Sequence, residues 1–201
     1  MATSDVIPGR ERDRARSVEF AKHSFTAEEF ERMGEAGIFR QGARLELIEG
    51  EIFQMSPIGS PHAACVNFLS RLLNRLFGDS HIVATQNPVR LNDTSEPQPD
   101  ICLLRWRDDF YRSAHPGPAD LLLLIEVADT TVVTDRSVKV PLYAGAGIAE
   151  TWLVNIPEGQ IEIYSTPSGG SYQRTEVFGR GAEARSHAVE GLAVSVGELL
   201  G

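Results

Sequence analysis

Two carboxylates next to apolar stretches, with a lysine after them, are the residues of this chain best placed to do chemistry. Asp100 follows the turn-forming Pro99, and Glu126 interrupts the apolar run 121–128. Lys139 is one of only two lysines in the chain, whose other basic side chains are arginines. A carboxylate among apolar residues needs a cation or hydrogen-bond donors to offset its desolvation. This combination predicts a metal-dependent phosphodiester hydrolase.

The expected chemistry depends on whether the two strands are neighbours. If they are, Asp100 and Glu126 can share a hard divalent cation through oxygen ligands, and Mg²⁺ suits such a site, with Mn²⁺ as a substitute. Lys139 would then orient a water or stabilise developing charge. A lysine ammonium suits this role because it can act as a point donor to a water, whereas an arginine guanidinium prefers forked contacts. The alternative, a solvated lysine on a helix surface, stays open.

Two further residues are candidates for the same site. Glu46 interrupts an early apolar run and could be a catalytic residue or metal ligand, although alternation along a strand also predicts a solvent-facing position. His62 could contact phosphate or act as an acid, although a histidine with satisfied hydrogen bonds near a helix start is the more frequent case. Gln86, expected inside a strand, could donate to the site, and Tyr143 should share a helix face with Lys139.

The composition favours an ordinary globular chain. With 201 residues and 42% hydrophobic content, we expect a flexible leader over residues 1–22 and a single domain over residues 23–201. No apolar run is long enough to cross a bilayer and no secretory signal is evident, so we expect a cytoplasmic protein without membrane contact. Cys65 and Cys102 lack the spacing of a zinc site and should be buried free thiols.

The net charge of −9 argues against a protein that coats nucleic acid through bulk electrostatics. A nuclease is still compatible with it, because bound cations offset active-site carboxylates. Trp106, Phe110 and Tyr111 could stack on bases, or could pack back on the domain. Scattered arginines could form a limited basic face, although a solvated surface is the commoner outcome: Arg71, Arg75, Arg90, Arg105, Arg107 and Arg112.

Apolar periodicity and turn residues predict an α/β or α+β fold with a mixed sheet flanked by helices. The residues Thr26 to Glu29 are typical of a capping box, and Glu49-Gly50 is typical of a hairpin turn. Ser60-Pro61 predicts the N-cap and the first residue of a helix that ends at Gly78. Strands are expected within 44–56 and at 81–91, 100–105, 121–128, 151–156, 160–165 and 172–178. Helices are expected near 26–37, 60–78 and 135–146, the last bent by Pro141, and after Ser195.

A series of motifs resembles the Uma-type putative restriction endonuclease family over about residues 25–163. The motifs, in order, are Glu46-Leu47-Ile48-Glu49-Gly50-Glu51, Gln86-Asn87-Pro88-Val89-Arg90-Leu91, Gln98-Pro99-Asp100, Leu124-Ile125-Glu126-Val127, Asp135-Arg136-Ser137-Val138-Lys139 and Leu142-Tyr143. That family belongs to the PD-(D/E)XK nuclease superfamily, so the resemblance implies a restriction-endonuclease-like mixed sheet with acidic metal ligands at its centre.

The resemblance implies roles for individual residues. Asp100 matches the aspartate of the PD element, Glu126 the second acidic residue and Glu46 an early glutamate, while His62 resembles a histidine after a proline-rich turn. The superfamily pattern has a lysine two places after the second acidic residue, and this chain has Ala128 at that position. Lys139 is similar to the lysine that related families carry on the following helix instead. Two hypotheses follow: a Mg²⁺-dependent DNA endonuclease that acts as a homodimer, or a catalytically inactive module that binds nucleic acid or a protein.

Overall fold

A six-stranded mixed sheet forms the centre of the computed structural model, which describes residues 21–201. Residues 1–20 of the expected leader lie outside the described part. The strand order is β3-β4-β5-β6-β7-β8, and every neighbouring pair is antiparallel except β5 and β6. The strands are β3 (His81–Thr85), β4 (Ile101–Arg105), β5 (Leu121–Ala128), β6 (Glu150–Asn155), β7 (Gln160–Ser168) and β8 (Ser171–Gly179).

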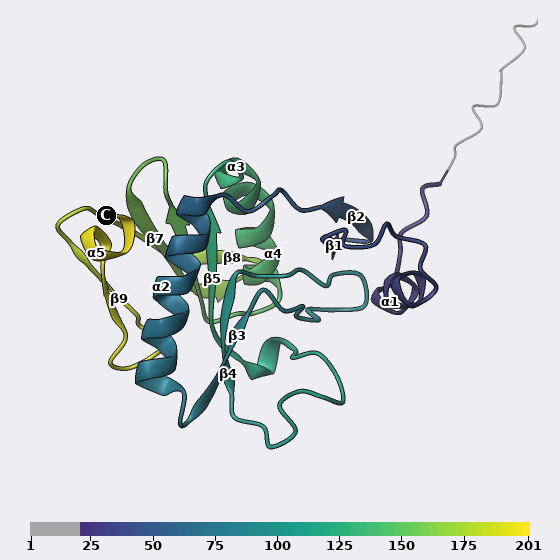
Figure 1. Ribbon diagram of the computed structural model, residues 1–201, viewed down its shortest axis with the longest axis horizontal. Helices are drawn as coiled ribbons and strands as arrows, with labels where there is room; N and C mark the ends of the chain where they lie inside the picture. The colour runs from purple at the N-terminus through teal and green to yellow at the C-terminus, as the bar shows by residue number, and fades with distance from the viewer. Residues whose placement is uncertain (1–20) are drawn as a thin grey trace, which may run out of the picture.

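Helices cover both faces of this sheet, which confirms the predicted fold class (Figure 1). The long helix α2 (Ser60–Phe77) packs on one face with α5 (Val196–Leu200) and the short strands β9 (Glu183–Arg185) and β10 (Ala193–Ser195). The helical segment formed by α3 (Val132–Thr134), a π-helical turn (Asp135–Lys139) and α4 (Val140–Gly145) lies on the other. No helix within residues 21–201 has the length and apolarity to cross a bilayer.

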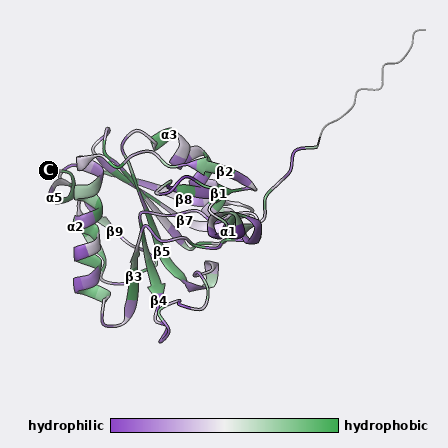
Figure 2. Ribbon diagram, turned by 45° about the vertical axis from the view of Figure 1, so that its right-hand side comes forward, coloured by the Kyte–Doolittle hydropathy of each residue, from purple (hydrophilic) through white to green (hydrophobic). Residues whose placement is uncertain are grey.

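Strand β5 is buried on both faces, as its continuous apolar run predicts. Leu123, Ile125 and Val127 pack toward α2, whereas Leu124 and Ala128 face the opposite side. Figure 2 shows hydrophobic residues concentrated on the central strands and a mixture of hydrophobic and hydrophilic residues along α2. Because side chains alternate along a strand, Glu126 points to the same side as Leu124, toward α4.

Helix α2 presents Cys65, Leu69 and Leu73 to the sheet at helical spacing. The predicted cap needs a correction, because Gly59 is the N-cap and Ser60 is already helical. The helix ends at Gly78 as expected. Both cysteines are buried and free, which also agrees with the prediction.

The hairpin of β1 (Leu45–Ile48) and β2 (Glu51–Gln54) turns through Glu49 and Gly50, whose φ angles are both positive, at 50° and 79°. Positive φ at both central residues is the type I′ geometry that suits a two-residue hairpin. A Cβ on Gly50 would lie 1.9 Å from Ser24 Oγ. Ser24, which lies three residues before the start of α1 (Ala27–Glu35), therefore leaves no room for a side chain at position 50. The predicted capping box of α1, Thr26 with Glu29, is present.

Strand β3 is shorter than the predicted 81–91, because it ends at Thr85. Gln86 has a φ of 54°, in the left-handed region, and therefore does not lie inside the strand as expected. Its backbone N–H donates to the Asp100 carbonyl at 3.0 Å. The chain thus turns beside the start of β4.

The helical segment after β5 begins at Val132, three residues before the predicted start. Its π-helical turn over Asp135–Lys139 precedes Pro141. Proline lacks an N–H and its ring clashes with the carbonyl four residues earlier, so a locally widened helix relieves that clash. The distortion expected at Pro141 therefore takes the form of a π-helical turn that carries Lys139.

An ion pair attaches this segment to β7. Arg136 donates from Nε to Glu162 Oε2 at 3.0 Å and from a terminal nitrogen to Oε1. Glu162 also accepts from Tyr164 and Asn155, and its side chain is only 4% exposed. Burial acts to raise the pKa of Glu162, but these hydrogen bonds outweigh it and lower the pKa to about 2.

We expect this lowered pKa to make the protein sensitive to acid. The ionised Glu162 stabilises the fold above its unfolded pKa of about 4.5, and this contribution is lost as the pH falls toward 2. Between pH 6 and pH 3, the wild type should therefore lose roughly 2 kcal/mol more free energy of unfolding than Glu162→Gln. Urea denaturation at both pH values measures this, with the exposed Glu35→Gln as control. Equal losses in wild type and Glu162→Gln would contradict the assignment.

Candidate active site

Asp100 and Glu126 lie side by side, because β4 and β5 are adjacent and Ile101 pairs with Ile125. The backbone N–H of Asp100 donates to Glu126 Oε2 at 3.3 Å. Both side chains are buried, with 6% and 3% of the residue exposed. The sequence-based expectation that these carboxylates share one edge of the sheet is thus met by the geometry.

Donors from three separate segments surround the Asp100 carboxylate. Val127 N–H donates to Oδ2 at 2.9 Å, His62 Nε2 lies 3.0 Å from the same oxygen, and Gln86 Nε2 donates to Oδ1 at 3.1 Å. Burial acts to raise the pKa of Asp100, but the bond from His62 and the other donors outweigh it, so the pKa is lowered. Asp100 is therefore ionised at neutral pH and fixed in orientation.

Glu126 also has three groups against it, the Asp100 N–H and two side chains of the helical segment. Tyr143 donates its hydroxyl to Oε1 at 2.5 Å, and Lys139 Nζ lies 3.3 Å from the same oxygen. Burial raises the pKa of Glu126 to about 8, even though Lys139 acts to lower it. A carboxyl group with this raised pKa gains from any additional cation nearby. Tyr143 and Lys139 do share a helix face, as predicted.

Lys139 is buried among three carboxylates, with 7% of its side chain exposed. Its Nζ lies 3.0 Å from Glu46, 3.3 Å from Glu126 and 3.9 Å from Asp135. Burial acts to lower the pKa of Lys139, but these carboxylates outweigh it and raise the pKa above its ordinary value. The alternative of a solvated surface lysine is therefore wrong.

Glu46 reaches the site from β1, and the solvent-facing alternative for it is also wrong, since only 6% of the residue is exposed. The hairpin is held in place by Leu47, which exchanges backbone hydrogen bonds with Glu96 at 3.3 and 2.7 Å. Gln98 N–H also donates to Glu46 Oε2 at 3.4 Å. Contacts with Glu96 and Gln98, some fifty residues later in the chain, thus hold Glu46 in position to contact Lys139.

Asp135 is a residue of the site to which the sequence interpretation gave no role. It is buried, accepts from Thr131 Oγ1 at 2.6 Å, and has a raised pKa because of burial, against the lowering effect of Lys139. Its spacing contained the missing signal, because residues four apart share a helix face and Asp135 precedes Lys139 by four positions.

His62, in the first turn of α2, joins the site through Asp100. Its Nδ1 is buried and has no hydrogen-bond partner. When Nε2 carries the proton, it donates to Asp100 Oδ2 at 3.0 Å and so stabilises the ionised carboxylate. The candidate residues Glu46, His62, Asp100, Glu126 and Lys139 therefore all meet at one place.

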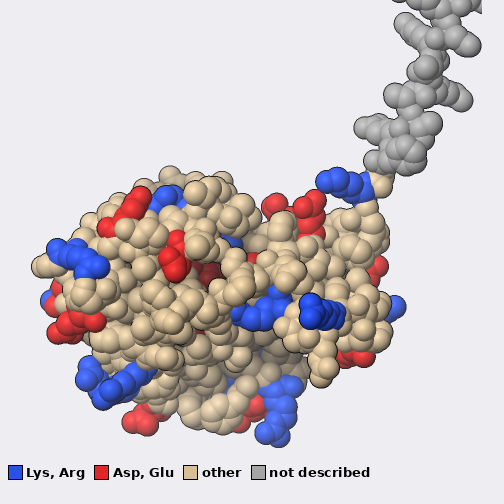
Figure 3. Space-filling view, turned by 45° about the horizontal axis from the view of Figure 1, so that its top comes forward, with Lys and Arg blue, Asp and Glu red and all other residues tan. Residues whose placement is uncertain are grey.

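A cavity of about 450 Å³ opens onto these five residues. It lies between the β1–β2 hairpin, the start of α2 and the segment after β5. Figure 3 views the side of the molecule that carries α3 and the start of α2, where acidic side chains lie in and beside a hollow and most of the surrounding surface is uncharged. Substrate can reach the carboxylates through this opening.

The scattered arginines do not gather at this cavity. Among the described residues, none of the six considered from the sequence lines it, and Arg44 is the arginine that does. Arg90 and Arg107 instead pair with nearby carboxylates. Trp106 and Phe110 are exposed and contact each other after the far end of β4, so the aromatic loop is not part of this site.

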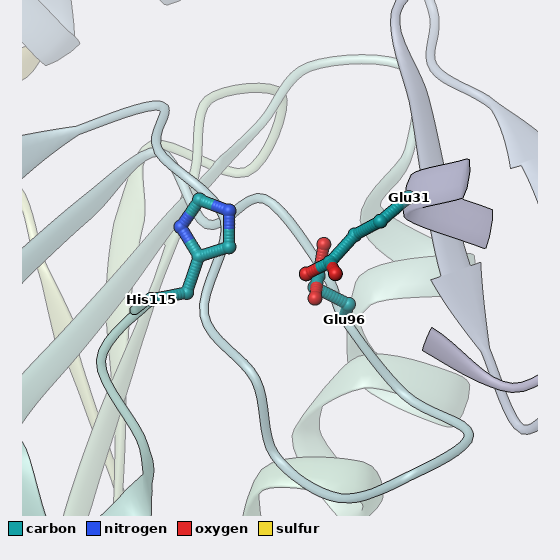
Figure 4. Close-up of side chains that lie close together, drawn as sticks. All are labelled: Glu31, Glu96 and His115. Carbon is teal, nitrogen blue, oxygen red and sulfur yellow. The ribbon is translucent and has the colours of Figure 1, made fainter. Parts of the chain in front are cut away.

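A second cluster within residues 21–201 has metal-ligand chemistry. Glu31, Glu96 and His115 offer ligand atoms that all lie within 4.8 Å of one another (Figure 4). However, Arg90 already lies against both carboxylates, with Nε 3.2 Å from Glu96 and a terminal nitrogen 3.0 Å from Glu31. Arg90 thus offsets the charge of both carboxylates, as Lys139 does for Glu46 and Glu126, and the cluster joins α1 to the segment before β4.

The donor chemistry around the cavity fits a divalent cation. Asp100, Glu126 and Glu46 offer oxygen ligands of the kind that Mg²⁺ prefers. Glu126 is buried with incomplete compensation, and its raised pKa marks a position where added positive charge is favourable. The residues present could therefore hold the ion that the sequence predicts.

The comparisons with known proteins agree with this architecture. The sequence profile described as "Uma2: Putative restriction endonuclease" matches residues 27–197, which confirms the resemblance seen in the motifs. A crystal structure from Anabaena variabilis, titled a putative nuclease belonging to DUF820, has 21% identity and a TM-score of 0.68. The match covers 88% of this chain and 97% of that one, and shows a shared fold. No curated protein matches the chain significantly.

We expect Lys139→Met to be strongly destabilising at pH 7. It removes the cation that three buried carboxylates share, and breaking a buried ion pair from one side costs about 3–5 kcal/mol of unfolding free energy. Lys139→Met/Glu126→Gln should recover part of that loss, because one unpaired carboxylate becomes neutral. Denaturant unfolding of both variants tests this, and a single variant as stable as the wild type would contradict the buried network.

Proposed function

Because the chain belongs to the Uma2 family of putative restriction endonucleases, we propose that it is a Mg²⁺-dependent nuclease that hydrolyses phosphodiester bonds, with DNA as its substrate. The observation that supports this most strongly is the convergence of Asp100, Glu126, Glu46 and Lys139 on one open cavity. Phosphodiester hydrolysis needs charge stabilisation and an oriented water more than covalent chemistry. The cavity offers groups for both.

In this proposal Asp100 and Glu126 hold the metal ion, and Glu46 contributes directly or through a water. A bound Mg²⁺ supplies Lewis-acid stabilisation of the negative charge that develops on the phosphoryl group. The protein's own contribution is to fix the ligands. Gln86, His62 and the Val127 N–H orient Asp100, and Tyr143 orients Glu126.

Lys139 orients the attacking water and stabilises charge, as a donor held in place by Glu46 and Asp135. Its ammonium is buried and carries three N–H donors, so binding of substrate can redirect one donor while the carboxylates keep the others. The lysine stands on the helical segment, and Ala128 occupies the position two places after Glu126. The π-helical turn brings its ammonium back to within 3.3 Å of Glu126.

His62 contacts the other side of the site. Its Nε2 lies 3.0 Å from Asp100, and its Nδ1 is buried and unpartnered. We propose that it positions Asp100. A catalytically inactive nucleic-acid or protein-binding module is the second candidate, favoured by the net charge of −9 and by the displaced lysine.

Cleavage of supercoiled and linear DNA by purified protein tests the proposal. With Mg²⁺ or Mn²⁺ we expect phosphodiester cleavage that falls by at least about 100-fold in Asp100→Ala, Glu126→Gln and Lys139→Ala, since each removes charge from the transition-state environment. Asp79→Ala, which removes an exposed carboxylate beyond the far end of α2, is the matched control and should retain activity. Thermal unfolding sets an assay temperature at which every variant, including the destabilised Lys139→Ala, is folded.

Two results would contradict the nuclease. Cleavage that survives both Asp100→Ala and Glu126→Gln would place the activity in another centre or in a contaminant. No cleavage of DNA or RNA by folded wild type with either metal would favour the binding module.

A further inference from the structure

The mouth of the active-site cavity is apolar, which is unusual beside a cluster of carboxylates. Phe53, Ile58 and Val138 all line the cavity and are exposed by 43%, 43% and 39%. They come from three separate segments: the β2 strand, the turn before α2 and the π-helical turn. Exposed apolar side chains that surround a polar site mark a surface that contacts a ligand.

The charges around the cavity do not favour binding of a nucleic-acid duplex through its phosphates. Of the described residues that line it, only Arg44 and Lys139 are lysine or arginine, and Lys139 is held by three carboxylates. Asp129 adds a further acidic group. Because duplex binding depends on many Lys and Arg contacts to phosphate, this cavity must gain affinity from another part of the nucleic acid.

Phe53 is the aromatic residue that could supply it. In the β1–β2 register Phe53 is paired directly with Glu46. Opposite residues in an antiparallel pair point to the same face, with Cβ atoms about 5 Å apart. The phenyl ring therefore stands at the mouth, next to a carboxylate that contacts Lys139.

We propose that Phe53 stacks on a nucleobase next to the scissile phosphate, so that the preferred substrate is a strand whose bases are unpaired there. This inference rests on the proposed nuclease function. In a duplex both faces of a base are covered by its neighbours, and exposing one requires unstacking or flipping. A single strand offers base faces freely, and aromatic stacking on them tolerates any sequence. Ile58 and Val138 provide apolar contacts on the opposite sides of the same opening.

Fluorescence anisotropy with a labelled 20-nucleotide oligothymidylate and its duplex with oligoadenylate tests this directly. Ca²⁺, which also takes oxygen ligands, replaces Mg²⁺, and a gel confirms that the probes stay intact. The wild type should bind the single strand more tightly than the duplex. Phe53→Ala should lose at least about fivefold in affinity for the single strand, and Phe53→Trp should restore it. Leu76→Ala, on a residue equally exposed at 43% in the last turn of α2, should bind as the wild type does.

Each outcome separates the two proposals. Tighter binding of the duplex, or equal single-strand affinity for Phe53→Ala and Leu76→Ala, would overturn the stacking role, while Asp100-dependent cleavage would still support the nuclease. Phe53-dependent binding without cleavage under Mg²⁺ would keep the stacking role and reject the nuclease. A Phe53-dependent dimer in sedimentation, with oligonucleotide affinity unchanged in Phe53→Ala, would show that a second copy covers the mouth and would also overturn the inference.

Discussion

The burial of Glu126 in the centre of the sheet is the constraint on which the rest of the site depends. A carboxylate on a strand covered on both faces must be compensated, and the compensation comes from Lys139 and Tyr143 on one helical segment. Lys139 in turn requires the carboxylates of Glu46 and Asp135. The result is a buried charge cluster in which each charge alone would destabilise the fold, while the charges together compensate one another.

This charge cluster accounts for features of the fold that a purely apolar core would not need. The helical segment is distorted into a π-helical turn where Lys139 must face the sheet, and Arg136 fastens that turn to β7 through Glu162. The β1–β2 hairpin is joined to the segment before β4, so Glu46 cannot move away without breaking backbone hydrogen bonds. Rigid elements therefore support the cavity on three sides, as a preorganised site requires.

The sequence predicted the sheet well, because its signals were local: the apolar run of β5, the capping box of α1 and the turn at Glu49-Gly50. The five candidate residues Glu46, His62, Asp100, Glu126 and Lys139 lie together in the structure, and their roles stay predictions. Errors arose where tertiary contacts decide the outcome. Gln86 leaves the strand because its backbone and side chain both bind Asp100. Glu46 is buried although strand alternation allowed exposure, because a lysine ninety-three positions later pairs with it. The site role of Asp135 likewise becomes clear only once Lys139 is known to face inward.

We propose that the buried carboxylates Asp100 and Glu126, and not the arginine-bridged Glu31 cluster, bind the divalent cation. Anomalous diffraction from crystals soaked in Mn²⁺ tests it most directly. We predict a peak between Asp100 and Glu126 that is absent from Asp100→Ala crystals. A peak at Glu31, Glu96 and His115 instead, or a cavity that remains empty at saturating Mn²⁺ while Lys139 keeps its contacts with Glu46 and Glu126, would contradict it.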